Sequence, residues 1–116
     1  MKRPADFAHP ENGKIQPISI TTDIIIGFCD ETEQDFQGSL DMIDYANFDM
    51  IYMGIYSPRP GTYAFKNLQD TVSRTEKQTR WKRMNTLLTR VSKDNNLAEV
   101  GTIREIMITA IDQTAK

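Results

Sequence analysis

The apolar and polar stretches of the chain alternate in a way that predicts strands and helices in turn. The run 18–26, Ile-Ser-Ile-Thr-Thr-Asp-Ile-Ile-Ile, is rich in β-branched residues and ends at Gly27. This pattern predicts a strand that is buried on both faces, as strands of parallel sheets usually are. A second strand is predicted over 49–56, and it ends in the turn-rich segment 57–62.

A helix is predicted between these two strands, over about 32–46. Thr32, followed three residues later by Asp35, resembles a capping box, which is a typical helix start. The apolar residues that recur at helical spacing after it are Phe36, Leu40 and Ile43.

A longer helix is predicted to begin at Ser73, which forms a second capping box with Glu76, and to reach about Asp94. Its apolar stripe consists of Trp81, Met84, Leu88 and Val91. After it, the β-prone stretch 102–110 predicts a last strand without an evident partner. The first 17 residues contain three prolines and no apolar period, so 1–17 is expected to be an irregular lead-in.

Strands that alternate with helices indicate an α/β fold with parallel pairing through right-handed crossovers. Ligands of such folds gather beyond the carboxyl ends of the strands, so function is expected in the loops 27–32 and 57–62. Two or three strands cannot close a barrel or cover a sheet. We therefore expect the unit to need neighbouring strands.

Composition narrows the function only slightly. The 116 residues are 39% hydrophobic and 26% charged, with no apolar run near the roughly 20 residues of a membrane helix. The formal net charge of -2 gives no general attraction to nucleic acid, so RNA contact would require a local patch. The single cysteine, Cys29, cannot form an internal disulfide, and a cytoplasmic location is expected.

Several side chains have both a chemical and a structural interpretation. Arg59 stands between two prolines after a predicted strand, which favours a role as a donor to carboxylate or phosphate. Glu31 just before a helix is favoured by the helix dipole alone, and Cys29 has no second cysteine with which to hold a metal. Trp81 is expected in the core, as are Tyr52 and Tyr56.

A run of basic residues lies outside the apolar stripe of the long helix. Such a run contacts RNA phosphates in some proteins and is a solvated helix face in more of them, so both interpretations stay open. Its members are Arg74, Lys77, Arg80, Lys82, Arg83, Arg90 and Lys93.

Four motifs, in this order, resemble the tRNA methylthiotransferases of the MiaB type, which are radical S-adenosylmethionine enzymes. They are Thr21-Thr22-Asp23-Ile24-Ile25-Ile26-Gly27-Phe28, then Glu31-Thr32-Glu33 with Asp35-Phe36, then Asn47-Phe48-Asp49, and finally Tyr56-Ser57-Pro58-Arg59-Pro60-Gly61-Thr62. The resemblance covers about 18–100. It departs from the family where Cys29-Asp30 replaces Pro-Gly and where a proline-rich stretch replaces the helix before the first strand.

The resemblance implies an architecture. Residues 18–96 would be carboxyl-terminal strand-helix units of a partial (β/α)6, TIM-like radical S-adenosylmethionine barrel. Residues 97–116 would be a linker and the start of a TRAM-like strand, after the irregular lead-in 1–17.

The resemblance also implies a function. The chain would be a fragment of an enzyme that adds a methylthio group to isopentenyl-adenosine beside the tRNA anticodon. The family uses S-adenosylmethionine and two 4Fe-4S clusters, one held by a C-x-x-x-C-x-x-C motif, and Cys29 alone cannot provide it. The fragment is therefore expected to be inactive without an amino-terminal, cluster-binding half, and its partner would be tRNA.

The residues that the resemblance suggests for cofactor binding are Thr22, Asp23, Ile25, Gly27 and Arg59, and it suggests no catalytic residue or metal ligand within the chain. Thr22 and Asp23 are equally well interpreted as a polar pair that satisfies the backbone inside a barrel. The alternative to the family function is a noncatalytic α/β module that binds a nucleotide or RNA, or that only pairs with a partner chain.

Overall fold

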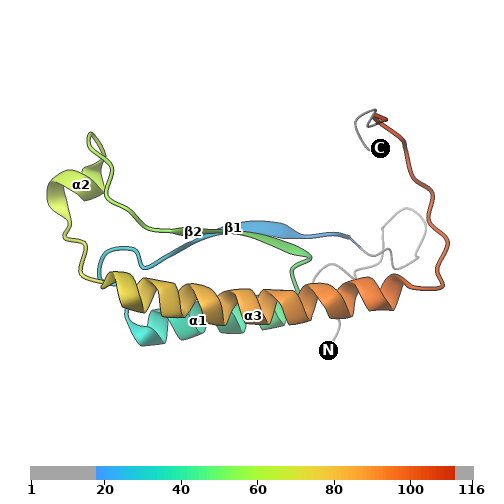
Figure 1. Cartoon of the computed structure of the whole chain (residues 1–116), viewed down its shortest axis with the longest axis horizontal. Coiled ribbons are helices and arrows are strands. Elements are labelled where there is room, and N and C mark those ends of the chain that lie inside the picture. Colours follow the sequence, from blue (N-terminus) through green and yellow to red (C-terminus); the bar gives the residue numbers. More distant parts are fainter. Residues whose placement is uncertain (1–17, 112–116) are drawn as a thin grey trace, which may run out of the picture.

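The computed structural model describes residues 18–111, and these form a small α/β unit. The elements are β1 (Thr21–Ile26), α1 (Glu33–Ala46), β2 (Met50–Ile55), α2 (Tyr63–Asn67) and α3 (Arg74–Glu99). In Figure 1, α1 and the long α3 lie on the same side of the two strands, while the short α2 stands apart beyond the end of β2.

The two strands pair in parallel, as the sequence predicted, in a register that joins Thr21 to Met50 and Ile26 to Ile55. Backbone hydrogen bonds extend the pairing beyond both ends. The amide of Asp49 donates to the carbonyl of Ile20 at 3.0 Å, and the amide of Tyr56 donates to the carbonyl of Ile26 at 2.8 Å. The residues that follow the two strands are thereby held side by side at one edge of the sheet.

The core lies between the sheet and the two long helices. Its buried members are Ile26, Phe36, Ile43, Ile51, Met84 and Leu88, with Leu40 and Trp81 packed against them. Val91 is also buried, so the apolar stripes predicted for both helices are confirmed. This burial drives the association of α1 and α3 with the sheet.

The other face of the sheet is open, which corrects the prediction of a strand buried on both faces. Ile25 is 59% exposed, and Tyr52, predicted to lie in the core, is 61% exposed. Side chains alternate between the two faces of a strand, so the single layer of helices covers only one set. Within 18–111 nothing packs on the set that includes Thr21, Asp23, Ile25, Met50, Tyr52 and Gly54.

The start of α1 is a complete capping box. The Thr32 hydroxyl accepts a hydrogen bond from the amide of Asp35 at 3.1 Å, and the Asp35 carboxylate accepts from the amide of Thr32 at 2.9 Å and from its hydroxyl at 2.7 Å. The hydroxyl bond, then the amide bond, lower the pKa of Asp35 below its ordinary value.

We expect Thr32→Ala to raise the pKa of Asp35 toward its ordinary value, because both the hydroxyl donor and the cap geometry are lost. A lowered folded-state pKa stabilises the fold above the ordinary pKa of 3.8, and this stabilisation is lost as the pH falls through the folded value. An NMR titration of the Asp35 carboxyl measures the shift, with Asp41 in the middle of α1 as the internal control. An unchanged Asp35 titration in Thr32→Ala would contradict the assignment.

The second predicted capping box is formed only in part. The Ser73 hydroxyl caps α3 by accepting from the amide of Glu76 at 3.2 Å, but the Glu76 carboxylate pairs with Arg80 at 2.6 Å. The helix then continues to Glu99, past the predicted end near Asp94.

The predicted strand over 102–110 is wrong for this structure, since these residues have no regular secondary structure. Their apolar side chains, such as Ile103 at 98% and Met107 at 85%, are largely exposed. Strand propensity depends on a partner strand and a surface to pack on, and the described chain offers this segment neither. The lead-in 1–17 lies outside the described residues.

Candidate functional site

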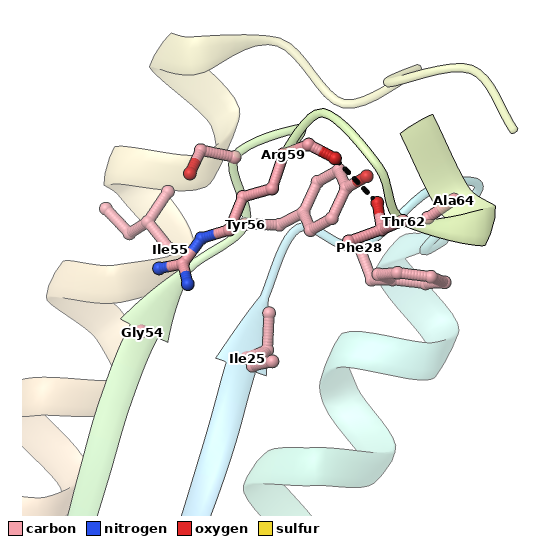
Figure 2. A pocket seen from close by; sticks show the side chains of 9 residues that line it. Ile25, Phe28, Gly54, Ile55, Tyr56, Arg59, Thr62 and Ala64 are labelled. Atoms are coloured by element: carbon pink, nitrogen blue, oxygen red, sulfur yellow. Dashed lines mark hydrogen bonds between the residues drawn. The ribbon is translucent and has the colours of Figure 1, made fainter. Parts of the chain in front are cut away.

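A hollow of about 450 Å³ lies at the carboxyl ends of the two strands, where the sequence placed function. It is lined by Ile25 and Phe28 from the first strand and its loop, and by Gly54, Ile55, Tyr56, Ser57, Arg59, Thr62 and Ala64 from the second strand to α2. Figure 2 shows these side chains around the strand ends. The lining is mostly apolar and aromatic, with a few polar groups, which is usual for small-molecule sites.

The wall of the hollow is an aromatic pair. The rings of Phe28 and Tyr56 meet edge to face, with centroids 5.0 Å apart and planes at 74°. Tyr56 is half-buried rather than a core residue, and a hydrogen bond to Cys29 is the main cause that raises the pKa of its phenol. The phenol is thus neutral at physiological pH and offers a polar edge to the hollow.

The rim of the hollow is the loop that follows β2. Thr62 closes this loop, because its hydroxyl donates to the carbonyl of Arg59 at 2.8 Å and accepts from the amide of Phe65 at 3.2 Å. In Figure 2 the Arg59 side chain turns back toward the strand ends, with its guanidinium on the side of Gly54 and Ile55. A cation is thereby presented to a mostly apolar hollow.

The structure brings together two of the five residues that the resemblance suggested, Ile25 and Arg59. Asp23 is on the same open face as Ile25 but two residues earlier in β1, further from the hollow. Its partner in β2 is Tyr52. Thr22 lies on the other face, beside α1, in a separate depression lined also by Ser39, Met42 and Phe48.

Gly27 is buried, and its position is explained by a protein contact. It has a positive φ of 74°, and a Cβ built there would lie 2.4 Å from Cγ of Lys77. Glycine permits both the backbone conformation and the close approach. The group that approaches Gly27 closely is the stem of Lys77 from α3, and the cofactor contact that the resemblance implied for Gly27 stays a prediction.

Two members of the basic run are buried. The prediction that they lie outside the buried stripe of the long helix is therefore wrong. Lys77 is 5% exposed and Arg80 is 2% exposed. Lys77 pairs with Asp70 at 2.6 Å, and Arg80 pairs with Glu31 at 2.6 Å. Neither cation is therefore available to RNA phosphates in this structure.

Two further cations of the run, Arg83 and Arg90, form exposed ion pairs with carboxylates of α1, at 2.6 Å to Glu33 and 3.2 Å to Asp44. Glu31, interpreted from the sequence as a helix-dipole residue, is also a hydrogen-bond acceptor for the amide of Gly27 at 3.0 Å.

Asp30 adopts the positive φ of 63° for which the family has glycine. An aspartate tolerates this conformation less well than glycine, but it gains contacts here. Its amide donates to the Thr71 hydroxyl at 2.8 Å, and that hydroxyl donates to the Asp30 carboxylate at 3.1 Å. The departure from the family pattern thus links the loop after β1 to the segment before α3.

Sequence reasoning missed Phe28, Gly54 and Tyr56 as parts of the site. Gly54 had a usable signal in the sequence, since a glycine within a strand often marks a position that a ligand or another backbone approaches closely. It lies opposite Ile25 in the register, and nothing lies within 4 Å of a Cβ built on it. The missing side chain leaves room for the hollow.

Residues 18–111 contain no group of three or more histidine, cysteine, aspartate or glutamate side chains placed to hold a metal ion. Among the same residues, no helix combines the length and apolarity needed to cross a membrane.

Comparison with known proteins gives a consistent set of relatives, although no protein-family model matches the chain. It is 43% identical over 93 residues to the tRNA-2-methylthio-N(6)-dimethylallyladenosine synthase of Chlorobium phaeobacteroides, a match of 80% of this chain and 21% of that protein. The synthase of the same name from Corynebacterium jeikeium is 40% identical over 97 residues, 84% of this chain and 19% of that protein. That of Geobacter sulfurreducens is 38% identical over 96 residues, 83% of this chain and 21% of that protein.

These matches confirm the resemblance stated from the motifs. The chain spans about one fifth of the length of the curated relatives it matches.

Proposed function

We propose, from the kinship of this chain with one segment of the tRNA-2-methylthio-N(6)-dimethylallyladenosine synthases, that it supplies the carboxyl-terminal strand-helix units of a radical S-adenosylmethionine barrel. In this proposal the hollow beyond β1 and β2 is part of the cofactor site. The complete enzyme would add a methylthio group to isopentenyl-adenosine beside the tRNA anticodon, in the cytoplasm.

The observation that carries the proposal is the chemistry of the hollow. Ile25, Phe28 and Tyr56 offer apolar and aromatic surface for an adenine ring, and Gly54 leaves room at the sheet. Arg59 at the rim offers a guanidinium, which binds carboxylates well, to the amino-acid end of such a cofactor. The residues present therefore fit S-adenosylmethionine, which supplies the radical chemistry when bound.

The chain's own residues would bind and orient the cofactor. The Phe28–Tyr56 wall limits where a planar ring can lie, because the edge-to-face pair fixes both aromatic planes. The neutral Tyr56 phenol offers a hydrogen bond, and Arg59 fixes the charged end. Asp23 on the open face is the candidate for a ribose hydroxyl, if the ligand extends along the sheet.

The residues do not fit a 4Fe-4S cluster. Such clusters need several cysteine thiolates, and the sequence has one cysteine, Cys29. We propose that the cluster ligands come from polypeptide outside these 116 residues, and that the chain alone does not catalyse the reaction. No catalytic step is assigned to its residues.

The open face of the sheet supports the proposal that the chain is part of a barrel. Parallel sheets are normally covered on both faces, and an isolated two-stranded sheet is marginal in water. Here Ile25 at 59% and Tyr52 at 61% exposure lie on the uncovered face. In a closed (β/α)6 barrel this face would be the interior, and further strands would continue the sheet. The exposed segment 102–111 would then belong to a following TRAM-like domain.

Titration of the purified chain with S-adenosylmethionine by calorimetry tests the cofactor site, with circular dichroism to verify folding. We expect saturable binding that Arg59→Ala weakens on the order of tenfold, the size of losing one hydrogen bond to a charged group. The matched control is Arg74→Ala, which removes an exposed arginine at the start of α3, away from the hollow.

A folded chain that does not bind the cofactor would contradict the site and would favour the noncatalytic alternative. In that case the open face of the sheet would bind another nucleotide or RNA, or would only pair with a partner chain. Equal weakening by Arg59→Ala and Arg74→Ala would show that binding depends on general charge rather than on the hollow.

A further inference from the structure

We infer that Lys77 and Arg80 of α3 are positioning residues for the hollow, and that together they hold the two loops that line it. The ligand side of this inference rests on the proposed cofactor site, whereas the holding of the loops rests on the contacts alone. Both cations are buried, and neither is among the residues that line the hollow.

Lys77 holds the end of β2. Its Nζ donates to the carbonyl oxygen of Tyr56 at 3.1 Å and to both carboxylate oxygens of Asp70 at 2.6 and 2.7 Å. The same ammonium lies 5.2 Å from the centroid of the Tyr56 ring. The backbone and the ring of Tyr56 are therefore both in contact with one cation.

Lys77 also holds the end of β1, through its stem. Its methylene groups occupy the space where a side chain at Gly27 would stand. A single side chain thus lies against Gly27 and Tyr56, the residues that directly follow the two strands.

Arg80 holds the loop between β1 and α1. Its Nη1 donates to the carbonyl of Glu31 at 3.0 Å and to Oε1 of the same residue at 2.6 Å. This Oε1 also accepts the amide of Gly27 at 3.0 Å. Glu31 is in turn tied back by its amide to the carbonyl of Phe28 at 3.0 Å. The loop that carries Phe28 is thereby fixed to α3 through Arg80.

The two contacts converge on the aromatic wall. Lys77 places Tyr56, and Arg80 places Phe28 through Glu31, so the edge-to-face geometry of the wall depends on both cations. Burying two cations is costly compared with an apolar core of similar volume. What the cations add is directional hydrogen bonds to the carbonyl of Tyr56, which follows β2, and to the carbonyl of Glu31, in the loop between β1 and α1, which apolar side chains cannot make.

Cys29 makes the arrangement measurable, because it is the chain's only cysteine and lies half-buried in the loop after β1, where it is hydrogen-bonded to Tyr56, the residue that Lys77 contacts. Its rate of reaction with a chromogenic disulfide reagent in native buffer reports how often the loop opens. We expect Lys77→Met, which keeps an unbranched stem but removes the ammonium, to raise this rate on the order of tenfold, since a lost hydrogen bond to a charged group biases opening by about that factor.

Two controls separate positioning from general stability. Lys82→Met removes an exposed lysine from the same helix and is expected to leave the rate unchanged. Leu88→Ala removes a buried core side chain far along α3 from the loops, and it is expected to destabilise the fold without the same rise in the native labelling rate. If Lys77→Met does not fold, Asp70→Asn takes its place, because it removes the carboxylate charge that holds the Lys77 ammonium beside Tyr56, and it is expected to raise the labelling rate by a smaller factor.

Binding of S-adenosylmethionine, measured on the same variants, is expected to weaken on the order of tenfold in Lys77→Met and not in Lys82→Met or Leu88→Ala. An unchanged labelling rate in folded Lys77→Met, or an equal rise in Leu88→Ala, would overturn the inference. If the unsubstituted chain binds no cofactor, the proposed site fails, while the labelling rates still decide whether the cations hold the loops.

Discussion

Replacing Arg80 by methionine is expected to lower the free energy of unfolding by about 3 to 5 kcal/mol, the usual cost of removing one partner from a buried ion pair. The Arg80 side chain is 2% exposed and that of Glu31 is 13% exposed, so the carboxylate would stay buried without its cation. The substitution also removes the pair with Glu76 and the contact with the Phe36 ring, whose centroid is 5.6 Å from the guanidinium carbon.

Urea denaturation followed by circular dichroism measures this loss. The matched control is Arg90→Met, which breaks an ion pair on the same helix whose side chains are 63% and 68% exposed. Exposed pairs contribute about 0 to 1 kcal/mol, so this variant should be nearly as stable as the original chain. Similar losses in Arg80→Met and Arg90→Met would contradict the role of burial.

A double substitution sharpens the result for Arg80. Glu31→Gln in the Arg80→Met background removes the charge that the first substitution leaves unpaired. The double variant should therefore lose less than the sum of the two single variants, because an uncompensated buried charge is the largest part of the cost. Additive losses would show that the two side chains do not act as a pair.

The burial of Lys77 and Arg80 was not predicted from the sequence. Positions 77 and 80 continue the stripe of Met84, Leu88 and Val91 backward at the same helical spacing, so their burial had a signal in the period. Both residues were nevertheless predicted to lie outside the stripe because they are charged, and lysine and arginine are almost never fully buried unless they are paired. Their partners, Asp70 and Glu31, come from separate loops, and only the folded chain brings these together.

The elements themselves followed from local pattern. A β-branched run predicted β1, a stretch closed by a turn-rich segment predicted β2, capping residues predicted both long helices, and the parallel pairing followed from their alternation. The segment 102–110 failed because its apolar residues need a second surface that the described chain does not provide. Helix α2 was missed because five residues carry no apolar period.

The sequence predicted the position of the candidate site better than it predicted the residues that line it. The rule that ligands gather beyond the carboxyl ends of parallel strands predicted the position of the hollow, and of the five residues that the resemblance suggested, Ile25 and Arg59 line it. Thr22 and Asp23 were treated together, yet neighbours on a strand point to opposite faces, so only one of them can face a ligand on the open face. The aromatic wall was missed, because its two rings come from residues far apart in the sequence, and Tyr56 was expected in the core.

Gly27→Ala is expected to destabilise the fold by roughly 3 kcal/mol, as the sum of two effects. An alanine at the positive φ of 74° costs about 1 to 2 kcal/mol, and forcing a methyl group into packed space costs about 1 to 3 kcal/mol more. The packed space is that of Lys77, whose Cγ would be 2.4 Å from the new Cβ. Denaturant unfolding measures the total.

Gly61→Ala separates the two effects. Gly61 also has a positive φ, of 89°, but a Cβ there would meet nothing within 4 Å. This variant should show only the backbone cost of about 1 to 2 kcal/mol. Gly54→Ala, with an ordinary φ and open space around it, should leave stability nearly unchanged while narrowing the hollow.

The contact with Lys77 is tested by making room for the methyl group. In a Lys77→Ala background, Gly27→Ala should cost only the backbone term, so the two substitutions should be coupled by about 1 to 3 kcal/mol. This coupling would show that Gly27 is required for the stem of Lys77 and hence for the contact between α3 and both strand ends. If Gly27→Ala lowers the free energy of unfolding equally in the original chain and in the Lys77→Ala background, the glycine is required only for the positive φ of the turn.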